Sequence, residues 1–158
     1  MCIQHRVTYL TAAELELCAE VRATCACNRL RHAMRGVTDL YEDALAASRL
    51  TATQLPILVG LASAGDLSVS ALADALSLDR TTLARNVQLL QERGLVRTSE
   101  SEEDRRLRIV SLTLEGSRVL SVALAGWEQM QGVVEERFGR ERLTALYGEL
   151  AALGDAIA

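Results

Sequence analysis

The chain has 158 residues, of which 49% are hydrophobic and only 3% aromatic, and its formal net charge is −4. This length suits one domain, or one compact unit with dimerising extensions, and the apolar share excludes an intrinsically disordered chain. No apolar run is long enough to cross a bilayer, and the N-terminus lacks the basic segment and apolar core of a secretory signal. We therefore expect a cytoplasmic protein with no membrane partner, and the abundance of Ala and Leu favours helix.

The basic residues are concentrated in one part of this mildly acidic chain. Residues 50–78 contain no Arg, whereas seven of the residues in 79–110 are Arg. They are Arg80, Arg85, Arg93, Arg97, Arg105, Arg106 and Arg108. The chain has no Lys, which a GC-rich genome mainly explains, but Arg also makes bidentate contacts to phosphate and guanine that Lys cannot make. The acidic net charge argues against a nucleic-acid partner, but this distribution weakens that objection, although residues 79–110 also contain six acidic residues.

Residues 11–48 are predicted to form one long helix. Thr11 and Glu14 have the spacing of a capping box, and apolar residues then recur at steps of three or four along one helix face. These residues are Ala19, Ala23, Ala26, Leu30, Met34, Val37, Tyr41 and Ala44. A helix of this length exceeds the needs of a small domain, so we expect it to pack against a second chain.

A second predicted helix begins near Leu50. Thr51 and Gln54 have capping-box spacing, and Leu50 with Leu55 has the spacing of a hydrophobic staple. Pro56, the only proline, falls in or just past the first turn, where it costs least.

Two short helices joined by a tight turn are predicted next. Ser68 caps the first helix and Asp79 caps the second, with the turn at 77–78 between them. Gly94 stands where a glycine ends the second helix. The buried face of that helix is expected to contain Leu83, Val87 and Leu90. This arrangement fits a helix-turn-helix.

A β-hairpin is predicted after the helix-turn-helix. Residues 95–98 and 107–112 form its strands, and the charged segment 99–106 between them forms a wing. Thr113 then caps a further helix, and Gly139 separates it from a final amphipathic helix.

These elements define the expected fold class, which is mainly α with a small β-hairpin wing. We assign residues 1–49 to an N-terminal dimerisation helix and residues 50–112 to a winged helix-turn-helix DNA-binding region. Residues 113–158 then form C-terminal dimerisation helices, and the three parts make one intertwined unit.

The order and spacing of several short motifs resemble the MarR family of bacterial transcriptional regulators. The motifs are Leu-Thr-x-x-Gln at 50–54, Leu-Ala-x-x-Leu at 72–76, Thr-Thr-Leu-x-Arg at 81–85, Leu-x-x-x-Gly-Leu-Val at 90–96, Asp-Arg-Arg at 104–106 and Val-x-Leu-Thr-x-x-Gly at 110–116. The resemblance implies a triangular homodimer interlocked by its N- and C-terminal helices. Its two winged domains would insert recognition helices into successive major grooves of double-stranded DNA, and wing tips into minor grooves, at a pseudo-palindromic operator.

The candidate DNA-binding residues lie in the second helix of the helix-turn-helix and in the wing. They are Arg80, Thr81, Thr82, Arg85 and Gln88 in the helix, and Arg105 and Arg106 in the wing. By the family resemblance, Asp104 orients Arg106, which enters the minor groove, where negative potential is concentrated. The simpler alternatives are helix-capping polarity for the two threonines and an ordinary surface ion pair for Asp104 and Arg106.

Four cysteines, at positions 2, 18, 25 and 27, lie in the N-terminal part. Cys25 is one turn from Arg22 and from Arg29, and nearby positive charge favours the thiolate that reacts with oxidants or binds a thiophilic metal or metalloid. Cys27 is two residues away, so on one helix the two thiols would not hold an ion together, and we expect Cys27 to be buried. The candidate sensing residues are, in order, Cys25, Cys18 and Cys2. The alternative is that all four cysteines only pack in the helix.

The sequence therefore predicts a DNA-binding regulator, most simply a repressor, and not an enzyme. A releasing signal would act at the cysteines or be a small aromatic ligand; Tyr41 and Trp127 could line a ligand cleft, although a core position is favoured for both. The remaining alternatives are a winged-helix module that only contacts proteins, which the acidic net charge favours, and a thiol-based enzyme. For the latter, no Cys–His–acid cluster or Gly-rich phosphate loop is evident.

Overall fold

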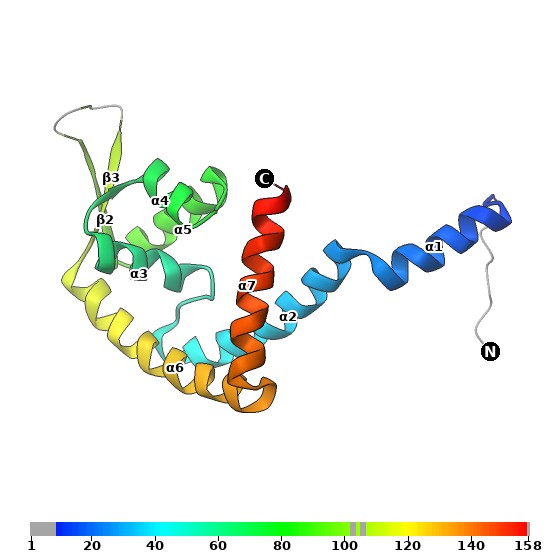
Figure 1. Ribbon diagram of the computed structural model, residues 1–158. Coiled ribbons are helices and arrows are strands. Elements are labelled where there is room, and N and C mark those ends of the chain that lie inside the picture. Colours follow the sequence, from blue (N-terminus) through cyan, green and yellow to red (C-terminus); the bar gives the residue numbers. More distant parts are fainter. Residues whose placement is uncertain (1–8, 102–103, 105–106, 158) are drawn as a thin grey trace, which may run out of the picture. The chain divides into compact units, whose positions relative to one another are not determined.

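The computed structural model describes residues 9–101, 104 and 107–157 (Figure 1). In chain order its elements are α1 (Ala12–Thr24), α2 (Ala26–Leu45), the 3-10 turn η1 (Ala46–Ser48), α3 (Gln54–Ala64), β1 (Leu67–Ser68), α4 (Val69–Ala75), α5 (Arg80–Glu92), β2 (Val96–Glu100), β3 (Arg108–Leu112), α6 (Leu114–Phe138) and α7 (Arg140–Ile157). Helices with one small antiparallel sheet confirm the predicted fold class. The chain divides into two compact units, residues 1–39 and residues 40–158.

The first unit contains α1 and most of α2, and the prediction of one continuous helix over residues 11–48 is wrong. α1 begins as expected, because Thr11 Oγ1 accepts from the Glu14 amide at 3.3 Å and the Glu14 carboxylate accepts from the Thr11 amide at 2.6 Å. It ends at Cys25, whose φ of −60° and ψ of 109° are extended rather than helical.

Hydrogen bonds from two side chains stabilise the break at Cys25. Thr24 Oγ1 donates to the Glu20 carbonyl at 2.9 Å, a bond that bends helices. Arg29 Nη2 donates to the Ala23 carbonyl at 2.8 Å, which satisfies an acceptor at the end of α1. The break therefore follows from side-chain contacts, without the proline or glycine that would signal it in the sequence.

The second unit has a leucine-rich core between α3, α4, α5, the sheet and the N-terminal half of α6. Its largest fully buried side chains are Leu45, Ile57, Leu58, Leu72, Leu83, Leu90, Val96 and Val110. Burying each of them contributes about 1.5–3 kcal/mol. The steps of four and three between Leu83, Val87 and Leu90 place all three on the core side of α5, as predicted.

The α3 start follows the sequence prediction closely. The Gln54 amide donates to Thr51 Oγ1 at 3.2 Å and the Thr51 amide donates to Gln54 Oε1 at 3.3 Å, and Leu50 and Leu55 are both buried. The helix itself begins at Gln54, so Pro56 lies in its first turn, where the missing N–H leaves no helical bond unmade.

The sheet has the strand order β1-β3-β2. β2 and β3 form the predicted hairpin, in a register that pairs Val96 with Leu112 and Glu100 with Arg108. On the other edge of β3, Leu67 pairs with Val110. The sequence did not predict β1, because a strand of two residues is too short to give an alternating pattern.

The N-terminus of α6 is anchored to the end of the helix-turn-helix. Thr113 Oγ1 donates to the Gly94 carbonyl at 2.7 Å and accepts from the Gly116 amide at 2.9 Å. A Cβ at Gly116 would collide with the carbonyl oxygen of Leu95. Glycine is therefore needed at position 116 because helix and loop backbones touch there.

Several helices expose large apolar side chains. They are Leu15, Leu17, Val21, Leu30, Met34 and Val37 in α1 and α2, and Val122, Leu124, Trp127, Phe138, Leu146, Tyr147, Leu150, Leu153 and Ile157 in α6 and α7. The core position favoured for Trp127 is therefore wrong for the single chain. Within the described ranges, no helix combines the length and apolar character needed to span a membrane.

Candidate DNA-binding interface

The outer face of α5 is polar, and its inner face is fixed in the core. Arg80, Thr81, Arg85 and Gln88 are all exposed, whereas Thr82 is half-buried. Because α5 is held by buried side chains on its opposite face, its exposed groups lie on a rigid element. This is the arrangement by which a recognition helix can present side chains to base edges and phosphates.

Asp79 caps the N-terminus of α5 as predicted. Its Oδ1 accepts from the Thr82 amide at 2.8 Å. Hydrogen bonds from the Thr82 side chain and then from its amide hold the pKa of the Asp79 carboxyl below its usual range. Thr82 thus takes part in the capping turn, in agreement with the simpler interpretation of this residue, while Thr81 stays exposed.

The β2–β3 hairpin lies next to α5 and carries two further arginines. Arg97 is exposed in β2, and Arg108 Nη2 in β3 lies 3.8 Å from Glu100 Oε1, with both side chains more than half exposed. Across the tip of the hairpin, the Ser101 amide donates to the Leu107 carbonyl at 3.0 Å and the Leu107 amide donates to the Asp104 carbonyl at 2.9 Å. The predicted wing residues Arg105 and Arg106 lie outside the described residues.

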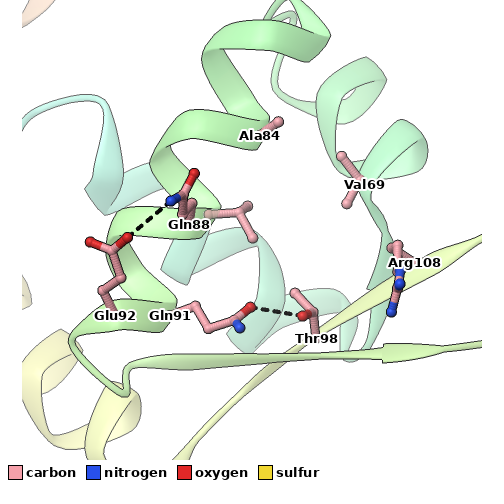
Figure 2. Close-up of a pocket in the computed structure, with 8 residues that line it drawn as sticks. Val69, Ala84, Gln88, Gln91, Glu92, Thr98 and Arg108 are labelled. Atoms are coloured by element: carbon pink, nitrogen blue, oxygen red, sulfur yellow. Dashed lines mark hydrogen bonds between the residues drawn. The ribbon is translucent and has the colours of Figure 1, made fainter.

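An open groove of about 460 Å³ separates α5 from the hairpin. Its lining is Val69, Ala84, Val87, Gln88, Gln91, Glu92, Thr98 and Arg108. Figure 2 shows that two hydrogen bonds organise its polar side: Gln88 Nε2 donates to Glu92 Oε1 at 3.0 Å, and Thr98 Oγ1 donates to Gln91 Oε1 at 2.7 Å. Of the predicted site residues that the structure describes, only Gln88 lines this groove.

Arg93 has a structural contact that the sequence analysis did not predict. It belongs to the seven arginines of the basic segment, but its guanidinium donates to the carbonyls of Arg49 at 2.7 Å and Ser48 at 3.1 Å. These bonds span more than 40 residues of sequence, so no local motif signals them.

The thiols of the N-terminal unit lie differently from the prediction. Cys25 is half-buried, and Cys18 and Cys27 are exposed, so the expected burial of Cys27 is wrong for the single chain. Arg31 Nη2 lies 3.5 Å from Cys27 Sγ. Because Cys25 is not helical, the argument that kept it and Cys27 on opposite faces of one helix does not apply. Cys2 lies outside the described residues.

The described part of the chain contains no cluster of three or more His, Cys, Asp or Glu side chains that could hold a metal ion.

Together, the packed helix-turn-helix, the hairpin and the exposed face of α5 define a winged helix-turn-helix protein. The MarR family model matches residues 50–107. The transcriptional regulator HosA of Escherichia coli is 35% identical over 75 residues, which are 48% of this chain and 56% of HosA. The chain thus aligns with about half the length of the curated relatives it matches.

Solved structures match over most of the chain. The transcriptional regulator MosR of M. tuberculosis, solved in complex with DNA, is 31% identical with a TM-score of 0.74, over 85% of this chain and 98% of MosR. The PcaV regulator of Streptomyces coelicolor, solved with its natural ligand, has a TM-score of 0.79 at 23% identity, over 86% of this chain and 96% of PcaV, and supports the fold alone. The chain belongs to the MarR family.

Proposed function

We propose that the protein is a sequence-specific, double-stranded DNA-binding transcriptional regulator, most simply a repressor, and not an enzyme. The observation that carries the proposal is α5, whose apolar face is buried and whose opposite face presents Arg80, Thr81 and Arg85 beside a β-hairpin. The MosR–DNA complex, similar over almost its whole chain, supports the same activity. A cytoplasmic location follows from this activity.

In this proposal α5 and the wing contact different grooves of the DNA. Arg80, Thr81, Thr82, Arg85 and Gln88 contact phosphates and base edges in the major groove, with the amides at the α5 N-terminus available to phosphate. In the wing, Arg105 and Arg106 contact the minor groove, and Asp104 orients Arg106. Gln88 must exchange its bond to Glu92 for a base edge, so its contribution is smaller than that of Arg85.

The protein acts as a homodimer in this proposal. The exposed apolar side chains of α1, α2, α6 and α7 are the expected dimer surface, since exposed patches of this kind mark interaction sites. Residues 1–49 and 113–158 then form the dimer, and residues 50–112 form the DNA-binding region. Two-fold symmetry predicts a pseudo-palindromic operator with half-sites about one helical turn apart.

The signal that releases the operator is expected either to act on a thiol or to be a small aromatic ligand. Cys25, in an irregular and half-buried segment, is the first candidate for an oxidant, electrophile or thiophilic metal, followed by Cys18 and Cys2. A small aromatic ligand is the other candidate. Binding of reduced and peroxide-treated protein to the same duplex separates them. A response that is lost in Cys25→Ser assigns that thiol, and one that persists points to Cys18 or Cys2. Equal binding in both states returns the cysteines to packing and leaves the ligand.

The test of the proposed function compares two arginines. Arg85→Ala removes a cation from the outer face of α5, whereas Arg118→Ala removes one from α6, where it pairs with Glu115 at 3.4 Å. Fluorescence anisotropy on a duplex selected by the wild-type protein from a random library should give at least about tenfold weaker binding for Arg85→Ala. Equal binding by both variants would remove Arg85 from the interface, and no duplex selected at low salt would favour the protein-contact module instead.

A further inference from the structure

The chain makes a tight corner between α2 and α3. Ser48 is buried, and its Oγ donates to the Leu45 carbonyl at 2.7 Å and accepts from the Leu50 amide at 3.3 Å. Arg49 has a φ of 55°, the left-handed region that non-glycine residues seldom adopt. Leu45 and Leu50, on either side, are both buried in the core. The corner therefore has one defined conformation, fixed by side-chain bonds and packing.

Arg93 joins the recognition helix to this corner. It is the C-cap residue of α5, and its two terminal nitrogens donate to the consecutive carbonyls of Arg49 and Ser48. The planar guanidinium donates to these two acceptors from two nitrogens in a fixed fork, whereas a lysine ammonium would have to reach both carbonyls from a single nitrogen. The Arg93 side chain therefore donates its hydrogen bonds to backbone carbonyls of a segment more than 40 residues away.

The same corner also contacts α6, which in turn contacts α7. A Cβ at Gly126 of α6 would collide with the carbonyl oxygen of Ala44, so the two backbones touch. One turn before the corner, Tyr41 donates to Gln131 Oε1 at 2.6 Å, and Gln131 Nε2 donates to the Tyr147 hydroxyl of α7 at 3.3 Å. A shift of α6 or α7 relative to α2 must therefore deform these contacts or move the corner.

We propose that Arg93 is a positioning residue that couples the orientation of α5 to the corner at 44–50, and through it to α6 and α7, rather than a phosphate contact. The proposal rests on the proposed function, because its consequence is the spacing of two recognition helices in a dimer. Hydrogen bonds and packed side chains between two parts can carry a coupling of this kind, and Arg93 supplies two such bonds.

The discriminating variants are Arg93→Lys, which keeps the charge but loses the two-nitrogen contact, and Arg93→Ala. Arg118→Lys is the matched control, since its exposed side chain lies on α6 outside the corner. Binding is measured by anisotropy on the selected duplex and on duplexes with two base pairs added or removed between the half-sites, over a range of salt concentrations. Amide hydrogen exchange of each free protein is measured in parallel.

We expect both Arg93 variants to bind the selected duplex about tenfold more weakly, with an unchanged salt slope and reduced preference for the native spacing. Arg93→Lys that binds like the wild type, or a salt slope lowered by about one in Arg93→Ala, would make Arg93 a phosphate contact and overturn the proposal.

The exchange measurement tests the coupling without DNA. The amides of Arg49 and Leu50 should exchange faster in Arg93→Lys together with those of Gly94 and Leu95 at the end of α5. Faster exchange confined to the end of α5 would overturn the coupling even if the protein binds DNA normally. A wild-type protein that selects no duplex would instead remove the proposed function, whatever the exchange result.

Discussion

The helix-turn-helix and the N-terminal helices use apolar residues in opposite ways. In α5 one face of apolar residues is buried within the same chain, with Leu83 and Leu90 at 0% exposure, whereas Leu17 in α1 is 57% exposed. Both segments have helical spacing and good N-caps. In both regions the local sequence pattern therefore decides where a helix forms. Only in the second unit does the chain itself supply the packing partners that stabilise its helices.

Core truncation gives the largest expected difference between the two regions. Leu90→Ala removes a fully buried side chain and should lower the free energy of unfolding by about 2–5 kcal/mol. Leu17→Ala, at an exposed position, should change the unfolding of the chain by less than about 0.5 kcal/mol and instead weaken dimerisation. Thermal unfolding and sedimentation measure the two effects. Equal loss of stability in both variants would mean that α1 packs on the same core.

Glycine-to-alanine substitutions should change the stability of the two units in opposite directions. Gly116→Ala puts a Cβ against the Leu95 carbonyl and should destabilise the second unit by about 1–3 kcal/mol. Gly36→Ala, in α2 of the first unit, meets no atom within 4 Å and should stabilise its helix by up to about 1 kcal/mol. Circular dichroism melts should separate the variants in sign, and a stable Gly116→Ala protein would refute the close approach of α6 to the loop.

Acid should weaken both helix caps, but with different effects on the free energy of global unfolding. The pKa of Asp79 is lowered by hydrogen bonds from the Thr82 side chain and amide, and that of Glu14 by bonds from Thr11. Because the folded-state pKa lies below the unfolded value of about 4, each cap stabilises its helix above that value and is lost as pH falls through the folded pKa.

Of these two capped helices, only α5 is part of the folded core, so only the Asp79 cap should influence the free energy of global unfolding. Asp79→Ala should lower stability at pH 7 and flatten its decline with acid below about pH 4. Thr11→Ala, in contrast, should fray α1 and leave the global transition unchanged. Denaturant melts from pH 7 to pH 3 test this, and an acid profile of Asp79→Ala identical to that of the wild type would refute the cap.

The smallest expected effect is at the wing. Glu100 and Arg108 are both exposed, so Glu100→Gln should change stability by less than about 0.5 kcal/mol. The same change removes a negative charge near DNA phosphates, so the operator affinity should rise a few-fold at low salt. Weaker binding in Glu100→Gln would mean that the ion pair orients Arg108 for DNA.

The sequence predicted most of the second unit because its signals are local. The caps at Ser68, Asp79 and Thr113 each accept a backbone hydrogen bond, and Gly65, Gly94 and Gly139 have the positive φ that ends a helix. On α5, the exposure of Arg80, Thr81, Arg85 and Gln88 could be predicted as the complement of a regular buried face, whereas Thr82 is half-buried.

Features that depend on distant contacts were not predictable. The helix break at Cys25 is a local feature, but the bond from Arg29 to the Ala23 carbonyl that accompanies it is not revealed by a helical pattern. The two bonds of Arg93 to the corner join segments that no motif relates. Counting charges placed this arginine in the Arg-rich segment but gave it no role, because composition records that a cation is present but not what it contacts.

The central claim is that the exposed face of α5 binds DNA, and its most direct test is the salt dependence of binding by the wild type and Arg85→Ala to the selected duplex. For the wild type, we expect log Kobs to fall linearly with log salt. Arg85→Ala should bind more weakly whether Arg85 contacts a phosphate or a base edge. A phosphate contact would also make the slope for Arg85→Ala smaller by about one. A wild-type protein that does not bind at low salt, or an Arg85→Ala variant with both affinity and slope unchanged, would contradict it.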